Sequence, residues 1–180
     1  MESASEDRIQ FFAKSADKRA GEGVGDQIKH PRMYESLCLI PNWRKIFCSL
    51  WDIQSFQHEG YTYKSVDHAY QAAKFCFCNC ESTAFLFALE SCSQIAGGSG
   101  LDAFHARKIC ILDHKQIKRW DTVSREFKRQ IYRSKYSQIP IAKQVLLGTC
   151  KAELWNKGPR IKEQRCYLLE ETREWLRSQT

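Results

Sequence analysis

The feature of this sequence that most restricts its fold is a long amphipathic segment, residues 115–138. Apolar side chains recur there every three or four residues, which is the spacing of one face of an α-helix. They are Ile117, Trp120, Val123, Phe127, Ile131 and Tyr132. The segment therefore predicts a long helix that packs into the core by this face.

Basic residues lie mostly away from that apolar face. They are Lys118, Arg119, Arg125, Lys128, Arg129 and Arg133. The simplest interpretation is a solvated helix face, and the alternative is contact with a nucleic-acid backbone. The net charge of +7, from 28 Lys+Arg against 21 Asp+Glu, likewise favours a phosphate-bearing or polyanionic partner without requiring one.

Shorter elements surround this helix in the predicted fold. Further helices are expected at residues 66–77, 81–95, 139–147 and 163–177, with another starting at Ser99 or Asp102. Short strands are expected near residues 11–12, 56–63 and 151–156. With 180 residues, 43% of them hydrophobic, the chain suits one domain with a sizeable core. We therefore expect an α+β, mainly α-helical single domain over residues 11–180, after a mobile tail at residues 1–10.

The nine cysteines bear on compartment and on metal binding. The chain shows no apolar leader and no run of about 18 apolar residues. We therefore expect reduced thiols in a cytoplasmic protein, with the nucleus as an alternative, that is not secreted and has no membrane partner. Cys76, Cys78 and Cys80 suggest zinc, but residues two apart on a helix point to different faces and no second cluster supplies ligands. No metal site is expected.

A polar stripe lies on the helix predicted at residues 66–77. Ser65 is the expected N-cap, and Asp67, Gln71 and Lys74 fall within a wedge of roughly 60° at about 100° per residue. The remaining positions are mostly apolar, so burial on most sides is expected. One interpretation is a structural Asp67–Lys74 pair or a solvent-facing row. The other is a catalytic pair in which burial lowers the pKa of Lys74 and frees its amine as a nucleophile.

Two glycine-rich loops are weaker candidates for binding phosphate. Residues 11–27 combine glycines, whose backbone can approach an anion closely, with positive charge. This loop contains Lys14, Ser15, Lys18, Gly21 and Gly23. It lacks the Lys-Ser/Thr pair of a P-loop, so a solvated loop is the favoured alternative. Residues 97–108 lead into a basic helix whose N-terminus could hold a phosphate, or simply connect two helices.

Several sequence blocks resemble the NADAR, or YbiA-like, family of N-glycosidases. SVDHAYQAAKF (residues 65–75) looks like the [ST]-x-E-H-x-[FY]-Q-A-x-K-F signature, and FFAKSADKRAGEGVG (residues 11–25) looks like the opening of the longer eukaryotic and viral-type branch. GGSGLDAFHARK, the RWD triplet and LLGTCKAELW are similar to later blocks in the same order. The resemblance implies a NADAR/YbiA-like fold and cleavage of a bond between a ribose carbon and a nitrogen.

The resemblance also implies residue roles. Lys74 corresponds to the lysine that attacks ribose C1″ and forms a Schiff base, Asp67 stands in place of the family's glutamate, and Asp121 in place of an acid after a tryptophan. Asp67, His68 or Asp121 would protonate the leaving guanine, Trp120 would stack on a base or ribose, and the two glycine-rich loops would hold the diphosphate. The expected substrate-binding residues are Lys14, Ser15, Lys18, Gly21, Gly23, His68, Tyr70, Gln71, Gly100, Asp102, Arg107 and Trp120. No cofactor is implied.

Three functions stay open on this resemblance. The preferred one removes ADP-ribose from ADP-ribosylated guanine in a nucleic acid or nucleotide, because the chain lacks the D-x-x-W-G segment of the bacterial riboflavin-linked branch. The second is an N-glycosidase acting on ribosylamino intermediates of riboflavin synthesis. The third is a non-catalytic module that binds ADP-ribose or nucleic acid. Asp67 is one methylene shorter than glutamate, and a displacement near 1 Å can cost about 10²-fold in rate.

Overall fold

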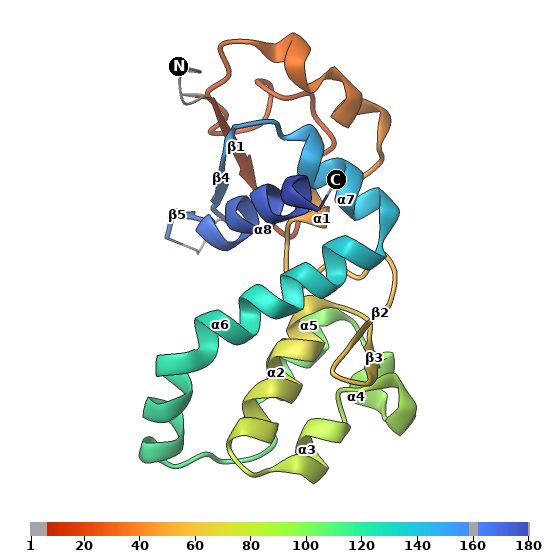
Figure 1. Cartoon of the computed structure of the whole chain (residues 1–180), viewed down its shortest axis with the longest axis vertical. Coiled ribbons are helices and arrows are strands. Elements are labelled where there is room, and N and C mark those ends of the chain that lie inside the picture. Colours follow the sequence, from red (N-terminus) through yellow and green to blue (C-terminus); the bar gives the residue numbers. More distant parts are fainter. Residues whose placement is uncertain (1–6, 159–161, 180) are drawn as a thin grey trace. The chain divides into compact units, whose positions relative to one another are not determined.

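The computed structural model describes residues 7–158 and 162–179 of the chain (Figure 1). Helices dominate and the strands are few and short, which confirms the predicted α+β, mainly helical fold class. The chain divides into two compact units. The first combines Met1–Cys48 with Pro140–Thr180, and the second is Ser49–Ile139. The domain predicted over residues 11–180 therefore includes parts of both units.

The first unit contains a three-stranded sheet of order β1-β4-β5. β1 (Arg8–Phe11) pairs in parallel with β4 (Glu153–Asn156), and β4 pairs antiparallel with β5 (Gln164–Arg165). In this register Ile9 lies opposite Leu154, and both side chains are fully buried. Residues from the two ends of the chain thus share one sheet and one core.

Helical segments complete the first unit. They are η1 (Pro31–Leu39), α1 (Trp43–Ile46), α7 (Pro140–Gly148) and α8 (Tyr167–Ser178). α8 packs against β4, and its buried Leu169, Thr172 and Leu176 lie on the face predicted to point inward, whereas Cys166 is half-buried (Figure 1). The helix starts later than the predicted residues 163–177, because Gln164 and Arg165 form β5. The rings of Phe11 and Phe47 meet at 5.3 Å between centroids. Burying such side chains supplies the main stabilisation of a core of this kind.

The mobile tail predicted at residues 1–10 is wrong for residues 7–10. Arg8 already belongs to β1, so the strand expected near Phe11 begins earlier. Asp7 is buried, and its carboxylate accepts hydrogen bonds from the Lys29 backbone N–H at 2.6 Å and the Tyr34 hydroxyl at 2.8 Å. A buried carboxylate is tolerated when donors surround it in this way. Residues 1–6 lie outside the described residues.

The second unit is arranged around α2 (Val66–Phe77). The helices that pack against α2 are α3 (Glu81–Phe85), α5 (Gly100–His105) and α6 (His114–Gln138) (Figure 1). The remaining short elements are η2 (Leu89–Ser91), α4 (Gln94–Gly97) and η3 (Ala106–Lys108). Phe75 of α2 stacks on Phe87 with centroids 5.7 Å apart, and both rings are fully buried.

A hairpin precedes α2, as the sequence predicts. β2 (Phe56–His58) pairs antiparallel with β3 (Tyr61–Tyr63). The two turn residues, Glu59 and Gly60, have φ values of 48° and 82°. A two-residue turn with positive φ at both positions matches the right-handed twist of the flanking strands.

α6 confirms the long helix predicted at residues 115–138 and starts one residue earlier. The Asp113 carboxylate accepts a hydrogen bond from the Gln116 N–H at 2.8 Å, and the Gln116 side-chain oxygen accepts one from the Asp113 N–H at 2.9 Å. This reciprocal capping box defines the helix start. Within the described residues, no helix is both long enough and apolar enough to cross a bilayer.

The single helix predicted at residues 81–95 is wrong, because α3, η2 and the start of α4 occupy this stretch. Cys92 adopts a left-handed conformation with φ 52°. The Ser93 hydroxyl donates a hydrogen bond to the Leu86 carbonyl and accepts one from the Ala96 N–H at 3.0 Å. The bond from Ala96 makes Ser93 the N-cap of α4. Serine side chains compete in this way with backbone hydrogen bonds, which favours a break in the longer helix here.

Candidate active site

α2 carries Asp67, Gln71 and Lys74 one and two turns apart, as the spacing predicts. The helix starts at Ser65, whose hydroxyl accepts a hydrogen bond from the His68 N–H at 3.3 Å. Asp67 and Gln71 are only 8% and 3% exposed, and Lys74 is half-buried. Such burial of a carboxylate, an amide and an amine is unfavourable unless each finds a partner.

Lys74 does not form the structural ion pair with Asp67 that the sequence leaves open. Across residues 7–158 and 162–179, no ion pair joins Lys74 to a carboxylate. Its amine lies 4.7 Å from the centroid of the Phe75 ring. Burial lowers the pKa of Lys74, Arg107 lowers it further, and Cys78 opposes this effect. A lysine with a lowered pKa spends more time as the neutral amine, which is its nucleophilic form.

Gln71 has an unsatisfied buried acceptor. Its side-chain oxygen Oε1 is shielded from solvent and accepts no hydrogen bond from any described residue. An unmet buried acceptor costs about 1–3 kcal/mol and needs an explanation in a native fold. Gln71 lies one turn from both Asp67 and Lys74, so a ligand hydroxyl placed over this face of α2 would satisfy it.

Arg107, at η3, adds a second positive charge close to Lys74. Its guanidinium lies 3.8 Å over the Phe104 ring and donates a hydrogen bond to the Phe104 carbonyl at 3.1 Å. The influence of Arg107 on the pKa of Lys74 shows that the two charges act on one another. Two neighbouring cations favour an anionic ligand group at this position.

His68 has a structural role instead of the predicted contact with substrate. It is fully buried, and its ring nitrogen Nε2 lies 3.0 Å from the Ile95 carbonyl oxygen, so Nε2 is the donor. Nδ1 then accepts the hydrogen bond from the Ser65 hydroxyl at 2.8 Å. Burial lowers the pKa of His68 and keeps the ring neutral. With both nitrogens occupied, His68 is no longer a candidate proton donor to guanine.

Trp120 is also a packing residue, contrary to the expectation that it stacks on a base or ribose. Its side chain is 4% exposed and its ring centroid lies 5.2 Å from those of Tyr70 and Phe127 and 5.8 Å from that of Phe77. Tyr70 is half-buried and joins this aromatic cluster. The following residue, Asp121, is exposed on α6.

Gly100 and Asp102 also have structural explanations. A Cβ atom on Gly100 would lie 2.1 Å from the Leu50 carbonyl oxygen, so only glycine fits. Asp102 forms a capping box with Ser99, whose side-chain and backbone hydrogen bonds lower the pKa of the Asp102 carboxyl. Both residues shape the start of α5. Of the predicted residues in the second unit, Asp67, Gln71, Lys74 and Arg107 have the features of a site.

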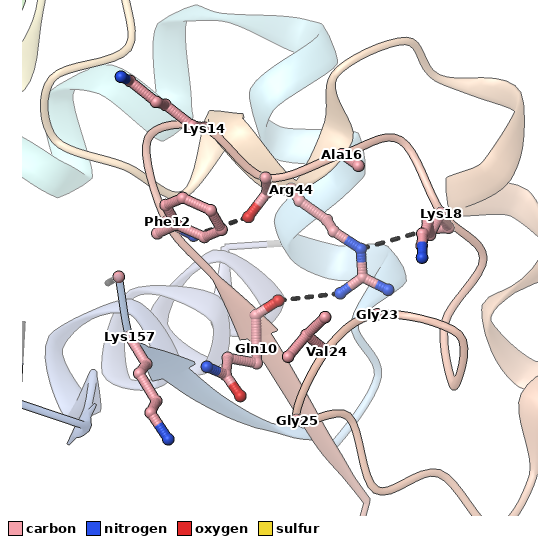
Figure 2. Close-up of a pocket in the computed structure, with 12 residues that line it drawn as sticks. Gln10, Phe12, Lys14, Ala16, Lys18, Gly23, Val24, Gly25, Arg44 and Lys157 are labelled. Atoms are coloured by element: carbon pink, nitrogen blue, oxygen red, sulfur yellow. Dashed lines mark hydrogen bonds between the residues drawn. The ribbon is translucent and has the colours of Figure 1, made fainter. Parts of the chain in front are cut away.

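The first unit holds a separate pocket of about 440 Å³ (Figure 2). It is lined by Gln10, Phe12, Lys14, Ser15, Ala16, Lys18, Gly23, Val24, Gly25, Arg44, Lys157 and Gly158. Four of the predicted residues, Lys14, Ser15, Lys18 and Gly23, lie there. Gly21 does not line this pocket, and its N–H donates to Asp26 Oδ2 at 2.9 Å.

A buried ion pair shapes this pocket. Arg44 donates hydrogen bonds to both carboxylate oxygens of Asp26, at 2.6 and 3.0 Å. It also donates to the backbone carbonyls of Gln10, Lys18 and Arg19. Figure 2 shows the first two of these backbone contacts. Because every side of the guanidinium is occupied, Arg44 holds the loop in place.

Ser15 is also occupied, because its hydroxyl accepts a hydrogen bond from the Phe12 N–H at 2.8 Å, whereas the three lysines and the Gln10 side chain are free to meet a ligand. No carboxylate in the described chain forms an ion pair with Lys14, Lys18 or Lys157. The Gln10 side chain is 8% exposed, and its amide has no hydrogen-bond partner among the described residues. Three lysines and the Gln10 amide among the lining residues suit a ligand that carries phosphate.

Sequence reasoning missed Gln10, Arg44 and Lys157. An arginine within the apolar stretch WRKIF is a signal that Arg44 needs a buried partner, although it does not reveal which one. Lys157 directly follows β4, but its place beside the loop at residues 14–25 depends on the parallel pairing of β1 with β4. Gln10 carries no such signal.

Comparison with known proteins supports the fold alone. No protein-family model and no curated protein matches this sequence. The structure is similar to the NMR structure of the E. coli protein YbiA, with a TM-score of 0.58 at 16% sequence identity. The match covers 97% of this chain and 88% of that chain. The chain therefore has a YbiA-like fold, as the sequence resemblance implies.

Proposed function

We propose that this chain is an N-glycosidase that removes ADP-ribose from ADP-ribosylated guanine, with Lys74 as the nucleophile. The observation that carries the proposal is the environment of Lys74, a half-buried amine with a lowered pKa and no carboxylate partner in the described chain. The YbiA-like fold and the sequence resemblance support the reaction class.

The spacing along α2 suits a sugar. Asp67 and Lys74 are seven residues apart on one face, roughly 10 Å along the helix axis at 1.5 Å per residue. Gln71 lies between them with its unsatisfied acceptor. A ribose over this face would place a hydroxyl on Gln71, its anomeric carbon near Lys74 and its leaving group within reach of an acid.

The proposed reaction has two steps at ribose C1″: transfer of the ribose from guanine to Lys74, and hydrolysis of the lysine adduct. The neutral Lys74 amine attacks C1″ and the bond from C1″ to the guanine nitrogen breaks. A carboxylate such as Asp67 takes the proton that the amine loses and passes it to the departing guanine nitrogen. Opening of the ribose ring converts the lysine adduct to an imine. Water then adds to C1″ and expels the amine, which releases ADP-ribose and restores Lys74.

The choice of ADP-ribose as the transferred group rests on charge. Arg107 and Lys74 place two cations at the proposed site, which favour a substrate that carries phosphate. The chain's net charge of +7 agrees with an anionic substrate. The two cations at the proposed site and the basic charge of the chain therefore support a phosphate-rich substrate over a small ribosylaminopyrimidine.

The test uses an oligonucleotide that carries ADP-ribosylated guanine, with wild type and Lys74→Ala, in the presence and absence of borohydride. Wild type should release ADP-ribose and, with borohydride, retain a reduced adduct that mass spectrometry places on Lys74. Lys74→Ala should lose on the order of 10³-fold or more in rate, because the nucleophile is gone. The rate should rise with pH and level off below the ordinary lysine pKa, since only the neutral amine attacks.

Lys118→Ala is the matched control, because Lys118 is an exposed lysine of the same unit. It should keep the wild-type rate and adduct. Full activity of Lys74→Ala would remove Lys74 from the reaction. Turnover of a ribosylaminopyrimidine in place of the oligonucleotide would contradict the proposed substrate. Binding of ADP-ribose without any turnover would indicate a non-catalytic binding module.

A further inference from the structure

A second pocket lies in the second unit, on the side of α2 opposite Lys74. At about 100° per residue, Ala69, Ala72, Ala73 and Cys76 lie at roughly 140–240° from Asp67, whereas Lys74 lies within about 20° of it. The pocket measures about 460 Å³, within the usual range for small-molecule sites. It is lined by His58, Glu59, Tyr61, Tyr63, Ala69, Ala72, Ala73, Cys76, Phe77, Glu81, Ala84, Phe85 and Phe127.

Aromatic rings form two walls of this pocket. Tyr61 and Phe85 lie 5.7 Å apart between centroids, and Phe77 and Phe127 lie 5.9 Å apart. Tyr61 and Phe85 are 44% and 41% exposed, which is unusual for side chains of this size. The alanines of α2 and α3 leave the space between the walls open. The faces of aromatic rings carry partial negative charge.

Both carboxylate residues that line the pocket are glutamates, and the Arg119 guanidinium lies outside the lining, 5.5 Å from the centroid of the Phe77 ring. Glu59 and Glu81 line the pocket, and none of its described lining residues is a lysine or arginine, although the chain has 28 of them. His58 adds no positive charge near neutral pH, because burial lowers its pKa and its Nδ1 is held at 2.9 Å by the Ser134 hydroxyl. The pocket is therefore acidic within a basic protein.

Tyr63 supplies a polar group that has no partner in the described chain. Its side chain lines the pocket, is 5% exposed, and makes no hydrogen bond with any described residue. Burial and the carboxylate of Glu90 raise the pKa of Tyr63 to about 12, with a smaller contribution from Glu59. The carboxylates of Glu90 and Glu59, which add to the effect of burial on this pKa, would stabilise a cation placed beside the phenol.

We propose that this pocket binds a small organic cation with an apolar body, of the alkylammonium class. The cationic head would lie against the rings, near Glu59 and Glu81, and the apolar body would cover the alanine floor. This site lies on the other face of α2 from the proposed reaction and does not depend on it. The two carboxylates disfavour an anionic ligand.

The test compares choline with 3,3-dimethylbutan-1-ol, its neutral carbon isostere, in NMR titrations of the full chain. Choline should shift the resonances of Tyr61, Tyr63 and Phe85, and the neutral isostere should bind at least tenfold more weakly. Equal binding of the two compounds would show that only apolar contact matters and would overturn the proposal. Absence of any shift with millimolar choline would also overturn it.

Three variants locate the site. Ala73→Leu fills the pocket and should abolish binding, and Glu81→Gln should weaken it several-fold. Glu22→Gln removes an exposed carboxylate in the first unit and should change nothing. Choline binding should persist in Lys74→Ala, which separates this site from the proposed active site. Binding that survives Ala73→Leu would place choline elsewhere and refute the assignment.

Discussion

The buried polar groups of the two units are built in opposite ways. In the first unit, Arg44 and Asp26 satisfy one another, and Arg44 also donates to three backbone carbonyls. In the second unit, Gln71 Oε1 and the Lys74 amine find no hydrogen-bonding or ionic partner among the described residues. Gln71 Oε1 and the Arg44–Asp26 pair are both shielded from water, so exposure does not explain the difference between them, whereas Lys74 is half-buried.

This contrast separates structural from functional polarity. A completed network such as Arg44–Asp26 fixes a loop and leaves the surrounding lysines to meet a ligand. An incomplete set such as Gln71 and Lys74 keeps an unmet acceptor and a reactive amine, at a cost in stability that a bound substrate would offset. Substitutions in the completed network should therefore lower the free energy of unfolding, whereas removal of the unmet acceptor should raise it.

The largest expected effect is on the completed network. Arg44→Met leaves the Asp26 carboxylate buried without its cation, which should lower the free energy of unfolding by about 3–5 kcal/mol. Urea denaturation followed by circular dichroism measures this loss. Arg19→Met, at an exposed neighbouring arginine, should change stability by less than about 0.5 kcal/mol. An unchanged stability for Arg44→Met would remove the distinction between the two regions.

A pH titration tests the satisfied histidine at the start of α2. Burial lowers the pKa of His68 in the folded protein, so the unfolded chain binds a proton first as the solution is acidified. Stability should therefore fall as pH drops below the ordinary histidine pKa, by at most about 1.4 kcal/mol per pH unit for this residue.

Urea denaturation at pH 7.5 and 5.0 measures this slope. His68→Asn should reduce the difference between the two pH values, even though it also lowers stability at both. His114→Asn, at an exposed position, should leave the difference as it is. If the dependence of stability on pH is unchanged in His68→Asn, another residue causes the acid sensitivity. His58 would be the next candidate, because burial lowers the pKa of His58 too.

Gln71→Met tests the buried polar groups of α2 that lack a partner. Removing an unsatisfied acceptor should raise the free energy of unfolding by about 1 kcal/mol and weaken ADP-ribose binding by about fivefold to tenfold. Gln116→Met is the matched control, because the Gln116 amide is satisfied by Asp113 and by the Cys78 carbonyl at 2.8 Å. That variant should lose about 1 kcal/mol. Stabilities that move together would show that Gln71 already has a partner.

Lys157→Ala should give the smallest effect. Its side chain is exposed at the first-unit pocket, so the fold should be unaffected. ADP-ribose binding, measured by calorimetry, should weaken about threefold to fivefold, and the loss should shrink as salt rises. Lys162→Ala removes an exposed lysine outside the pocket and should have no effect. Equal losses in both variants would point to general charge attraction.

The sequence by itself determined the features that depend on neighbouring residues. The stripe of Asp67, Gln71 and Lys74 follows from helical periodicity, and the long α6 follows from its apolar face and the capping box at Asp113. The hairpin turn at Glu59 and Gly60 follows from turn chemistry. Each depends on residues within a few positions of one another, which is the range that sequence patterns record.

Only the tertiary structure decided which groups lack or find distant partners. It broke the helix predicted at residues 81–95, buried Trp120 in an aromatic cluster and placed the Gly100 backbone against Leu50. It also joined Arg44 to Asp26, 18 positions away along the chain. Burial is a property of packed side chains, so the sequence suggested that Lys74 is reactive, and the packed structure buried its amine and lowered its pKa.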